Sequence, residues 1–153
     1  MYKHILVPTD GSKLSERAIK EAARLAAGTG AKLTLLHAAP LQIWPIYAES
    51  AIIMHEYSNK EMRAQMQAQG AALLAKAAKA ATRAGFGAAI DLVFTELVFT
   101  DVPWDAVVKA AARLKCDLVV MASHGHRGLA GFLLGSETQK VLTHCKVPVL
   151  VVR

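Results

Sequence analysis

Residues 117–136 read DLVVMASHGHRGLAGFLLGS, and this stretch decides the fold. It opens with a continuous apolar run, passes through a segment rich in glycine and reaches Gly135-Ser136, where we expect a helix to start. A short unbroken run of Leu, Val and Met is typical of a strand covered on both faces, as in parallel sheets. The stretch therefore predicts a strand, a loop and a helix in succession, which is the repeating unit of an α/β fold.

The rest of the chain repeats this alternation of strands and helices. Further strands are predicted at 5–7, 33–36, 90–98 and 147–152, and helices at 12–27, 56–84, 103–114 and 136–143. Ser12 supplies a capping side chain for the first helix. Strands alternating with helices form right-handed βαβ units. We therefore expect a single domain over residues 1–153, a doubly wound five-stranded parallel sheet with helices on both faces.

Composition and charge exclude several classes of protein. Cys116 and Cys145 are far apart and form no disulfide framework, which suits a reducing compartment. The N-terminal residues lack the apolar region of a signal peptide, and charged residues interrupt the Ala- and Leu-rich stretch 70–84. The net charge of +6 comes from scattered Lys and Arg, without a basic run or interleaved aromatic residues. We expect a cytoplasmic protein that neither inserts into membranes nor binds nucleic acid.

Two loops are expected to meet in a ligand site. In an open α/β sheet, ligands bind outside the carboxyl ends of the strands, where residues 8–11 and 122–131 follow the first and fourth strands. Glycines allow backbone N–H groups to approach phosphate oxygens, and a helix N-terminus favours an anion. Ser136 is expected at the N-cap of the following helix, and Arg127 would add a charged contact. Neither GxxxxGK[ST] nor GxGxxG after the first strand is present.

Several segments resemble the universal stress protein family. They are HILVPTDGS at 4–12, LTLLHA at 33–38, PWDAVVKAA at 103–111 and the whole of 117–153. The resemblance implies a Rossmann-like sheet with strand order 3-2-1-4-5. The ATP-binding members carry Gly-x2-Gly-x9-Gly-Ser or Thr, and this chain has Gly125, Gly135 and Ser136 but Ala122 in place of the first glycine. A left-handed backbone at Ala122 would cost about 1 kcal/mol, whereas close approach to a ribose alone would accommodate one methyl group.

The resemblance also implies how the ligand would lie. The ligand would be ATP, or ADP or AMP, with Mg²⁺ or Mn²⁺. Asp10 would lie near the ribose or hold the divalent metal on the phosphates. The other implied contacts are Pro8, Thr9 and Ala38 for the adenine, Met121 and Ala122 for the ribose, and His124, Gly125, Arg127, Gly135, Ser136 and Glu137 for the phosphates.

These features favour a nucleotide-binding module of stress response and regulation without fast turnover. A slow ATPase remains an alternative, as does a dimeric interaction protein with no nucleotide. Ser123 and His124 are neighbours, and adjacent side chains rarely face each other, so no nucleophilic pair is expected. His124 is expected to order its loop by bonding to backbone. His124 and His126 are too few ligands for zinc.

Two surfaces are expected to contact other groups. The apolar strand expected at 147–152 is the last in the predicted strand order and therefore lies at an edge of the sheet. A bare apolar sheet edge is a site for pairing with another chain. We expect a homodimer through Val147–Arg153, with two-fold symmetry making the contact self-complementary. Residues 40–55 are the least regular segment. They are interpreted as a loop packed on the body, with a flap over the site or a partner surface as alternatives.

Overall fold

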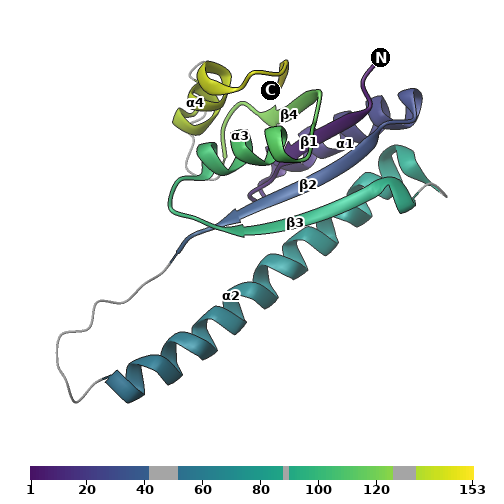
Figure 1. The fold of residues 1–153 in the computed structure, drawn as a ribbon. Coiled ribbons are helices and arrows are strands. Elements are labelled where there is room, and N and C mark those ends of the chain that lie inside the picture. The colour runs from purple at the N-terminus through teal and green to yellow at the C-terminus, as the bar shows by residue number, and fades with distance from the viewer. Residues whose placement is uncertain (42–51, 88–89, 126–133) are drawn as a thin grey trace.

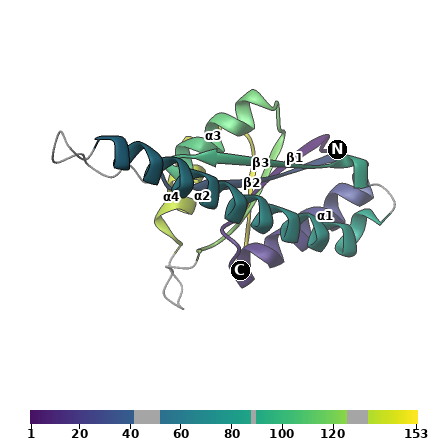
Figure 2. The same ribbon diagram turned by 90° about the horizontal axis from the view of Figure 1, so that it is seen from below.

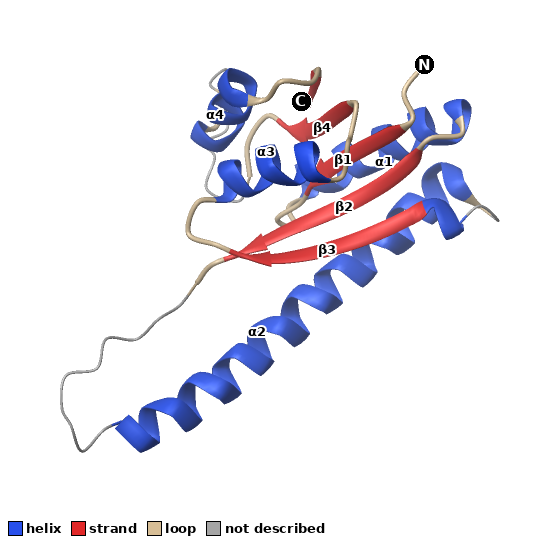
Figure 3. Cartoon of the chain, in the orientation of Figure 1, coloured by secondary structure: helices blue, strands red, loops and turns tan. Residues whose placement is uncertain are grey.

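A computed structural model describes residues 1–41, 52–87, 90–125 and 134–153 (Figure 1). Figure 3 distinguishes its strands from its helices. The strands are β1 (His4–Pro8), β2 (Lys32–Ala39), β3 (Val93–Phe99), β4 (Leu118–Ala122) and β5 (Val149–Val152). The α-helices are α1 (Lys13–Thr29), α2 (Ile52–Ala81), α3 (Pro103–Arg113) and α4 (Ser136–His144). Between α2 and β3 lie a π-helical turn at Thr82–Phe86 and a 3-10 turn at Ile90–Leu92.

The five strands form one parallel sheet in the order β3-β2-β1-β4-β5. This confirms the predicted fold class and strand order. The register aligns Ile5 of β1 with Leu33 of β2 on one side and with Leu118 of β4 on the other. The order changes direction at β1, so the loops after β1 and β4 leave the same edge from neighbouring strands.

Alternate residues of the central strands fill two separate core layers. Ile5 and Val7 face α1 and α2, whereas Leu6 faces α3 and α4. The same alternation in β4 sends Val120 to the first layer and Val119 to the second. Figure 2, turned by 90°, shows how the helices are arranged around the sheet. Both faces of the sheet are therefore covered, as the continuous apolar strands predicted.

The ends of α1 are set by its sequence. The Ser12 side chain accepts a hydrogen bond from the Ser15 N–H at 3.1 Å, which confirms Ser12 as the N-cap. Gly30 ends the helix in the left-handed conformation, at φ 69°, where glycine carries no steric penalty. The helix start is thereby fixed directly behind the turn that follows β1.

The segment around α2 differs from its prediction. α2 begins at Ile52 rather than Glu56, so residues 52–55 belong to a helix and not to the expected loop, while 42–51 lie outside the described residues. The α-helix ends at Ala81, and the next turn is π-helical up to Phe86, whose side chain enters the core. No helix within the described ranges combines the length and apolarity needed to cross a membrane.

Candidate functional site

A cavity of about 240 Å³ lies at the carboxyl edge of the sheet. It is bounded by the ends of β1, β2 and β4, the first turns of α1 and α3, and α4. Nine of the twelve residues predicted to contact the ligand line it: Pro8, Thr9, Asp10, Ala38, Met121, Ala122, His124, Gly125 and Glu137. Gly135 and Ser136 are outside this lining, and Arg127 lies outside the described residues.

Backbone hydrogen bonds hold the turn after β1 in place. The Thr9 N–H donates to the Leu36 carbonyl at 2.8 Å, and the His37 ring donates through Nδ1 to the Thr9 carbonyl, also at 2.8 Å. Asp10 Oδ1 accepts the Ser12 N–H at 3.0 Å. The turn is therefore fixed to β2 by His37, a residue whose role the sequence did not reveal.

Asp10 and Gly125 both line the cavity and lie against each other. A Cβ added at Gly125 would overlap Asp10 Oδ2 far inside van der Waals contact. Gly125 is not among the described residues with positive φ, so glycine is required there for space and not for conformation. No group of three His, Cys, Asp or Glu that could hold a metal occurs in the described ranges. A metal at Asp10 would therefore depend on oxygen atoms of the ligand.

The backbone conformation at Ala122 shows whether this position needs the left-handed conformation that glycine favours. Ala122 is the last residue of β4, aligned with Val152 of β5, and Lys115 is the one non-glycine residue with positive φ in the described ranges. The position is ordinary strand, so a methyl group costs no backbone strain. The remaining requirement at Ala122 is that its side chain be small enough to leave room in the cavity.

Ser123 and His124 do face each other, contrary to expectation. The Ser123 hydroxyl lies 3.1 Å from His124 Nδ1, so within the described residues one ring nitrogen bonds to a side chain. Ser123 is buried, and its N–H donates to the Val152 carbonyl at 2.8 Å. The pair orders the end of β4. Within the described residues, no carboxylate bonds to the His124 ring to complete a catalytic triad.

The N-cap of α4 is Gly135, and the prediction of Ser136 at that position is wrong. Ser136 is the first helical residue and is exposed, and the N-cap residue Gly135 has no side chain with which to cap the helix. Instead, the Gly135 N–H donates to the Ser123 carbonyl at 2.8 Å, and the Thr138 hydroxyl donates to the Ala122 carbonyl at 3.0 Å. These two bonds tie the start of α4 to the end of β4.

Glu137 has a structural partner in addition to its place in the cavity wall. Its Oε2 accepts the Trp104 N–H at 2.8 Å, so the carboxylate caps the N-terminus of α3, where the uncapped N–H groups and the helix dipole favour negative charge. Lys140 lies 3.6 Å from the other carboxylate oxygen. Glu137 therefore joins α3 to α4 beside the cavity, and its carboxylate is already engaged.

The first turn of α3 supplies cavity residues that the sequence analysis missed. The Trp104 ring packs against His144, with the ring centroids 4.6 Å apart, and Trp104 also lines the cavity. The available signal was topological, because the loop after β3 leaves the same edge of the sheet as the loops after β1 and β4. The other missed lining residues are Ser15, Leu36, Pro103, Val107, Thr138 and Val141.

Comparison with known proteins gives consistent matches. The family model described as the universal stress protein family matches residues 1–153. Universal stress protein MJ0531 of Methanocaldococcus jannaschii is 31% identical over 153 residues, covering 100% of this chain and 83% of that protein. Among solved structures, UspA from Lactobacillus plantarum matches with a TM-score of 0.78 at 22% identity, covering 99% and 98% of the two chains. A universal stress protein in complex with cAMP matches with a TM-score of 0.66 at 30% identity, covering 99% and 97%.

Proposed function

The chain belongs to the universal stress protein family, and from that premise we propose that it is a stress-response module that binds ATP in the cavity at the carboxyl edge. The observation that carries the proposal is the convergence of the predicted contact residues, from separate segments, on one cavity. The structure of a relative with cAMP bound supports an adenine nucleotide as the ligand class. ADP and AMP are the alternative ligands at the same site.

Each part of the cavity suits one part of a nucleotide. Apolar surfaces near Pro8, Ala38 and Trp104 suit the adenine ring. The strand end at Met121-Ala122 would lie against the ribose, and glycine at Gly125 leaves room for the Asp10 carboxylate in the same wall of the cavity. Gly135 and Ser136, at the start of α4, would contact the phosphates, as the family resemblance implies.

Mg²⁺ or Mn²⁺ would bind through Asp10 and the nucleotide phosphates. Mg²⁺ is commonly held by one or two carboxylates together with substrate phosphates and waters. A single carboxylate at the cavity mouth, without a complete protein cage in the described residues, fits that pattern. The metal would neutralise phosphate charge beside Asp10, which otherwise repels an anion.

The proposed module holds its nucleotide without fast turnover. Glu137 is engaged with the α3 N-terminus, and Ser123 is buried under the β4 end, so neither is arranged to activate water. A slow ATPase is the alternative activity. Single-turnover hydrolysis faster than roughly 1 s⁻¹, the lower end of typical enzymes, contradicts the proposal.

The decisive experiment identifies the nucleotide and tests the site together. Freshly purified protein is denatured and any released nucleotide is identified by mass spectrometry, and the emptied protein is then titrated with ATP, ADP and AMP by calorimetry. At about 100 times the dissociation constant, a ligand should stabilise the fold by about 2.7 kcal/mol. Absence of binding of all three at millimolar concentration, with and without Mg²⁺, overturns the proposal.

Two variants at Ala122 test whether ATP binds in this cavity. Ala122→Val fills cavity space at a position whose extended backbone suits a β-branched residue. ATP affinity should fall at least roughly tenfold, about 1.4 kcal/mol. Ala122→Gly, the matched control, should bind ATP as well as the parent. Equal affinity in Ala122→Val places the nucleotide elsewhere.

We also propose a homodimer through Val147–Arg153. β5 lies at the sheet edge, and Leu150 is 44% exposed there. Leu150→Lys should yield monomers in sedimentation, whereas Leu142→Lys on α4, where the side chain is 40% exposed, is the matched control and should remain dimeric. A monomeric parent, or a dimer that survives Leu150→Lys, excludes this interface.

A further inference from the structure

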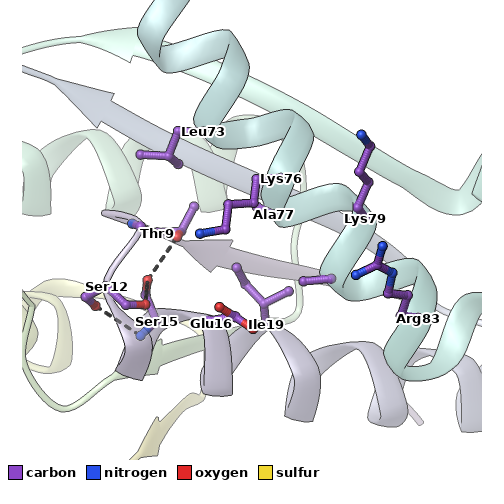
Figure 4. Close-up of a pocket in the computed structure, with 12 residues that line it drawn as sticks. Thr9, Ser12, Ser15, Glu16, Ile19, Leu73, Lys76, Ala77, Lys79 and Arg83 are labelled. Atoms are coloured by element: carbon purple, nitrogen blue, oxygen red, sulfur yellow. Dashed lines mark hydrogen bonds between the residues drawn. The ribbon is translucent and has the colours of Figure 1, made fainter.

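A second cavity, of about 300 Å³, lies between α1 and α2 on the other face of the sheet (Figure 4). It shares Thr9 and Ser15 with the cavity at the carboxyl edge, so the start of α1 forms a wall between the two. Its lining includes two apolar side chains, Leu73 and the core residue Ile19. The volume reaches the lower end of the range for small-molecule sites.

The α2 side of this cavity is strongly basic. Lys76, Lys79 and Arg83 line it at spacings of three and four residues, which places them on neighbouring turns of one helix surface and the π-helical turn that follows. None of the three forms an ion pair within the described residues. Like charges at this spacing repel and slightly destabilise a helix. The cluster therefore carries a cost that a bound anion would offset.

The one carboxylate in the lining is already paired. Glu16 lies 2.7 Å from Lys20, and the hydrogen bond and charge of Lys20, with a smaller contribution from Lys76, lower the pKa of Glu16. Lys76 on α2 and Glu16 on α1 line the same cavity from opposite helices. Lys76 extends toward the α1 side of the cavity, whereas Lys79 points away from it (Figure 4). The lining thus holds three exposed cationic side chains and a single carboxylate whose charge Lys20 largely balances.

The α1 side of the cavity supplies a hydroxyl donor. The Ser15 hydroxyl donates to the Ser12 carbonyl at 2.9 Å, so in its 3.0 Å bond with Thr9 it accepts. Ser12 Oγ accepts the Ser15 N–H, and no acceptor for its own hydrogen is recorded in the described part of the chain. Figure 4 shows Lys76 extending toward Thr9 and Ser15. Ser12 and Lys76 both line the cavity, and each offers a donor hydrogen to an anion.

We propose that this cavity binds a small organic phosphate. The phosphate would lie at the end formed by Lys76 and the Ser12 hydroxyl, where charge-assisted hydrogen bonds are available. An apolar portion would contact Ile19 and Leu73, and Arg83 would add attraction from the far end. This site is separate from the proposed nucleotide site, with which it shares only a wall.

The test uses phenyl phosphate, which combines a phosphate with an apolar ring, and inorganic phosphate as the comparison. Both are titrated into ¹⁵N-labelled full-length protein, and amide shifts locate the site. Phenyl phosphate should shift amides of α1 and of 73–83, and should bind more tightly than inorganic phosphate. Shifts confined to the cavity at the carboxyl edge, or no shift at 10 mM phenyl phosphate (roughly ten times the upper end of ordinary substrate constants), overturn the inference.

Two charge variants on the same helix complete the test. Lys76→Gln should weaken phenyl phosphate binding roughly tenfold or more, since a hydrogen bond between charged groups is lost. Lys60→Gln, an exposed residue of α2 outside the cavity, removes the same charge and should leave affinity unchanged. If both variants weaken phenyl phosphate binding equally, the effect comes from the net charge of the protein and the proposed site is refuted. Ala122→Val should still bind phenyl phosphate, so loss of nucleotide binding and loss of this site are distinguishable.

Discussion

Replacing Gly125 with alanine tests whether Asp10 and the loop after β4 are fitted to each other. The new Cβ would overlap Asp10 Oδ2, so the carboxylate must turn away, and we expect this to weaken the hydrogen bond that its Oδ1 accepts from the Ser12 N–H. A hydrogen bond to a charged group contributes about 1.5–3 kcal/mol, and partial exposure of Asp10 favours the lower end. At about 2–4 °C per kcal/mol for a domain of this size, the melting temperature should fall by about 3–6 °C.

The affinity for ATP with Mg²⁺ should fall with it, because the displaced carboxylate no longer occupies its place beside the phosphates. We expect a loss of roughly tenfold, about 1.4 kcal/mol, by calorimetric titration. Gly28→Ala is the matched control. An added Cβ at Gly28 meets nothing within 4 Å, and alanine is favoured in a helix by about 1 kcal/mol. Its melting temperature should rise and its ATP affinity should not change.

A double-mutant cycle with Asp10→Ala tests whether the overlap with Asp10 causes the loss of stability in Gly125→Ala. In an Asp10→Ala background the carboxylate is gone, so Gly125→Ala should cost little further stability, and the difference between backgrounds measures the coupling of the two positions. If Gly125→Ala lowers the melting temperature equally in both backgrounds, the overlap with Asp10 is not the cause. An unchanged melting temperature in the parent background refutes the reasoning altogether.

Three further predictions concern the fold. Gly85→Ala would bring a Cβ to 2.7 Å from the Ala23 carbonyl oxygen, which is backbone of α1, and should lower the free energy of unfolding in urea by about 1–3 kcal/mol; an unchanged midpoint refutes it. Burial lowers the pKa of His4 below its ordinary value of about 6.5, so the unfolded chain takes up the proton first and stability should fall as pH drops below about 6.5. Melting temperatures from pH 7 to 5 should fall less in His4→Gln, and parallel profiles contradict this. Burial raises the pKa of Cys116 to about 11, so its thiol should react with a disulfide reagent at pH 8 far more slowly than in urea, and equal rates would contradict it.

The sequence predicted the sheet well because buried parallel strands are short, continuous and apolar. Runs such as residues 118–121 carry that signal alone, and the family resemblance supplied the strand order. The start of α2 was missed because residues 52–55 have no capping signal and a mixed composition. Local patterns thus located the elements, and their ends were less exact.

The site was predictable where it depends on loops that leave the sheet edge, and less so where it depends on contacts distant in sequence. Ser136 has the right chemistry for an N-cap, but the extended backbone one residue earlier assigns that position to Gly135. The bond between Glu137 and Trp104 joins residues 33 apart, and no local pattern signals it. Ala122 departed from a glycine motif, and only the strand geometry showed that the methyl group costs no strain.

The strand order also sets the sequence of events during synthesis. β1 is made first and can pair early with β2, but its other neighbour, β4, comes more than a hundred residues later, and Asp117 then binds the Lys3 N–H across 114 positions. At about 5–20 residues per second, the ribosome needs roughly 6–23 s to cover that distance. For that time one side of β1 is an open hydrogen-bonding edge. The walls supplied by β4 and α4 are made late, so a nascent chain can hold the first half of its sheet before the cavity at the carboxyl edge exists.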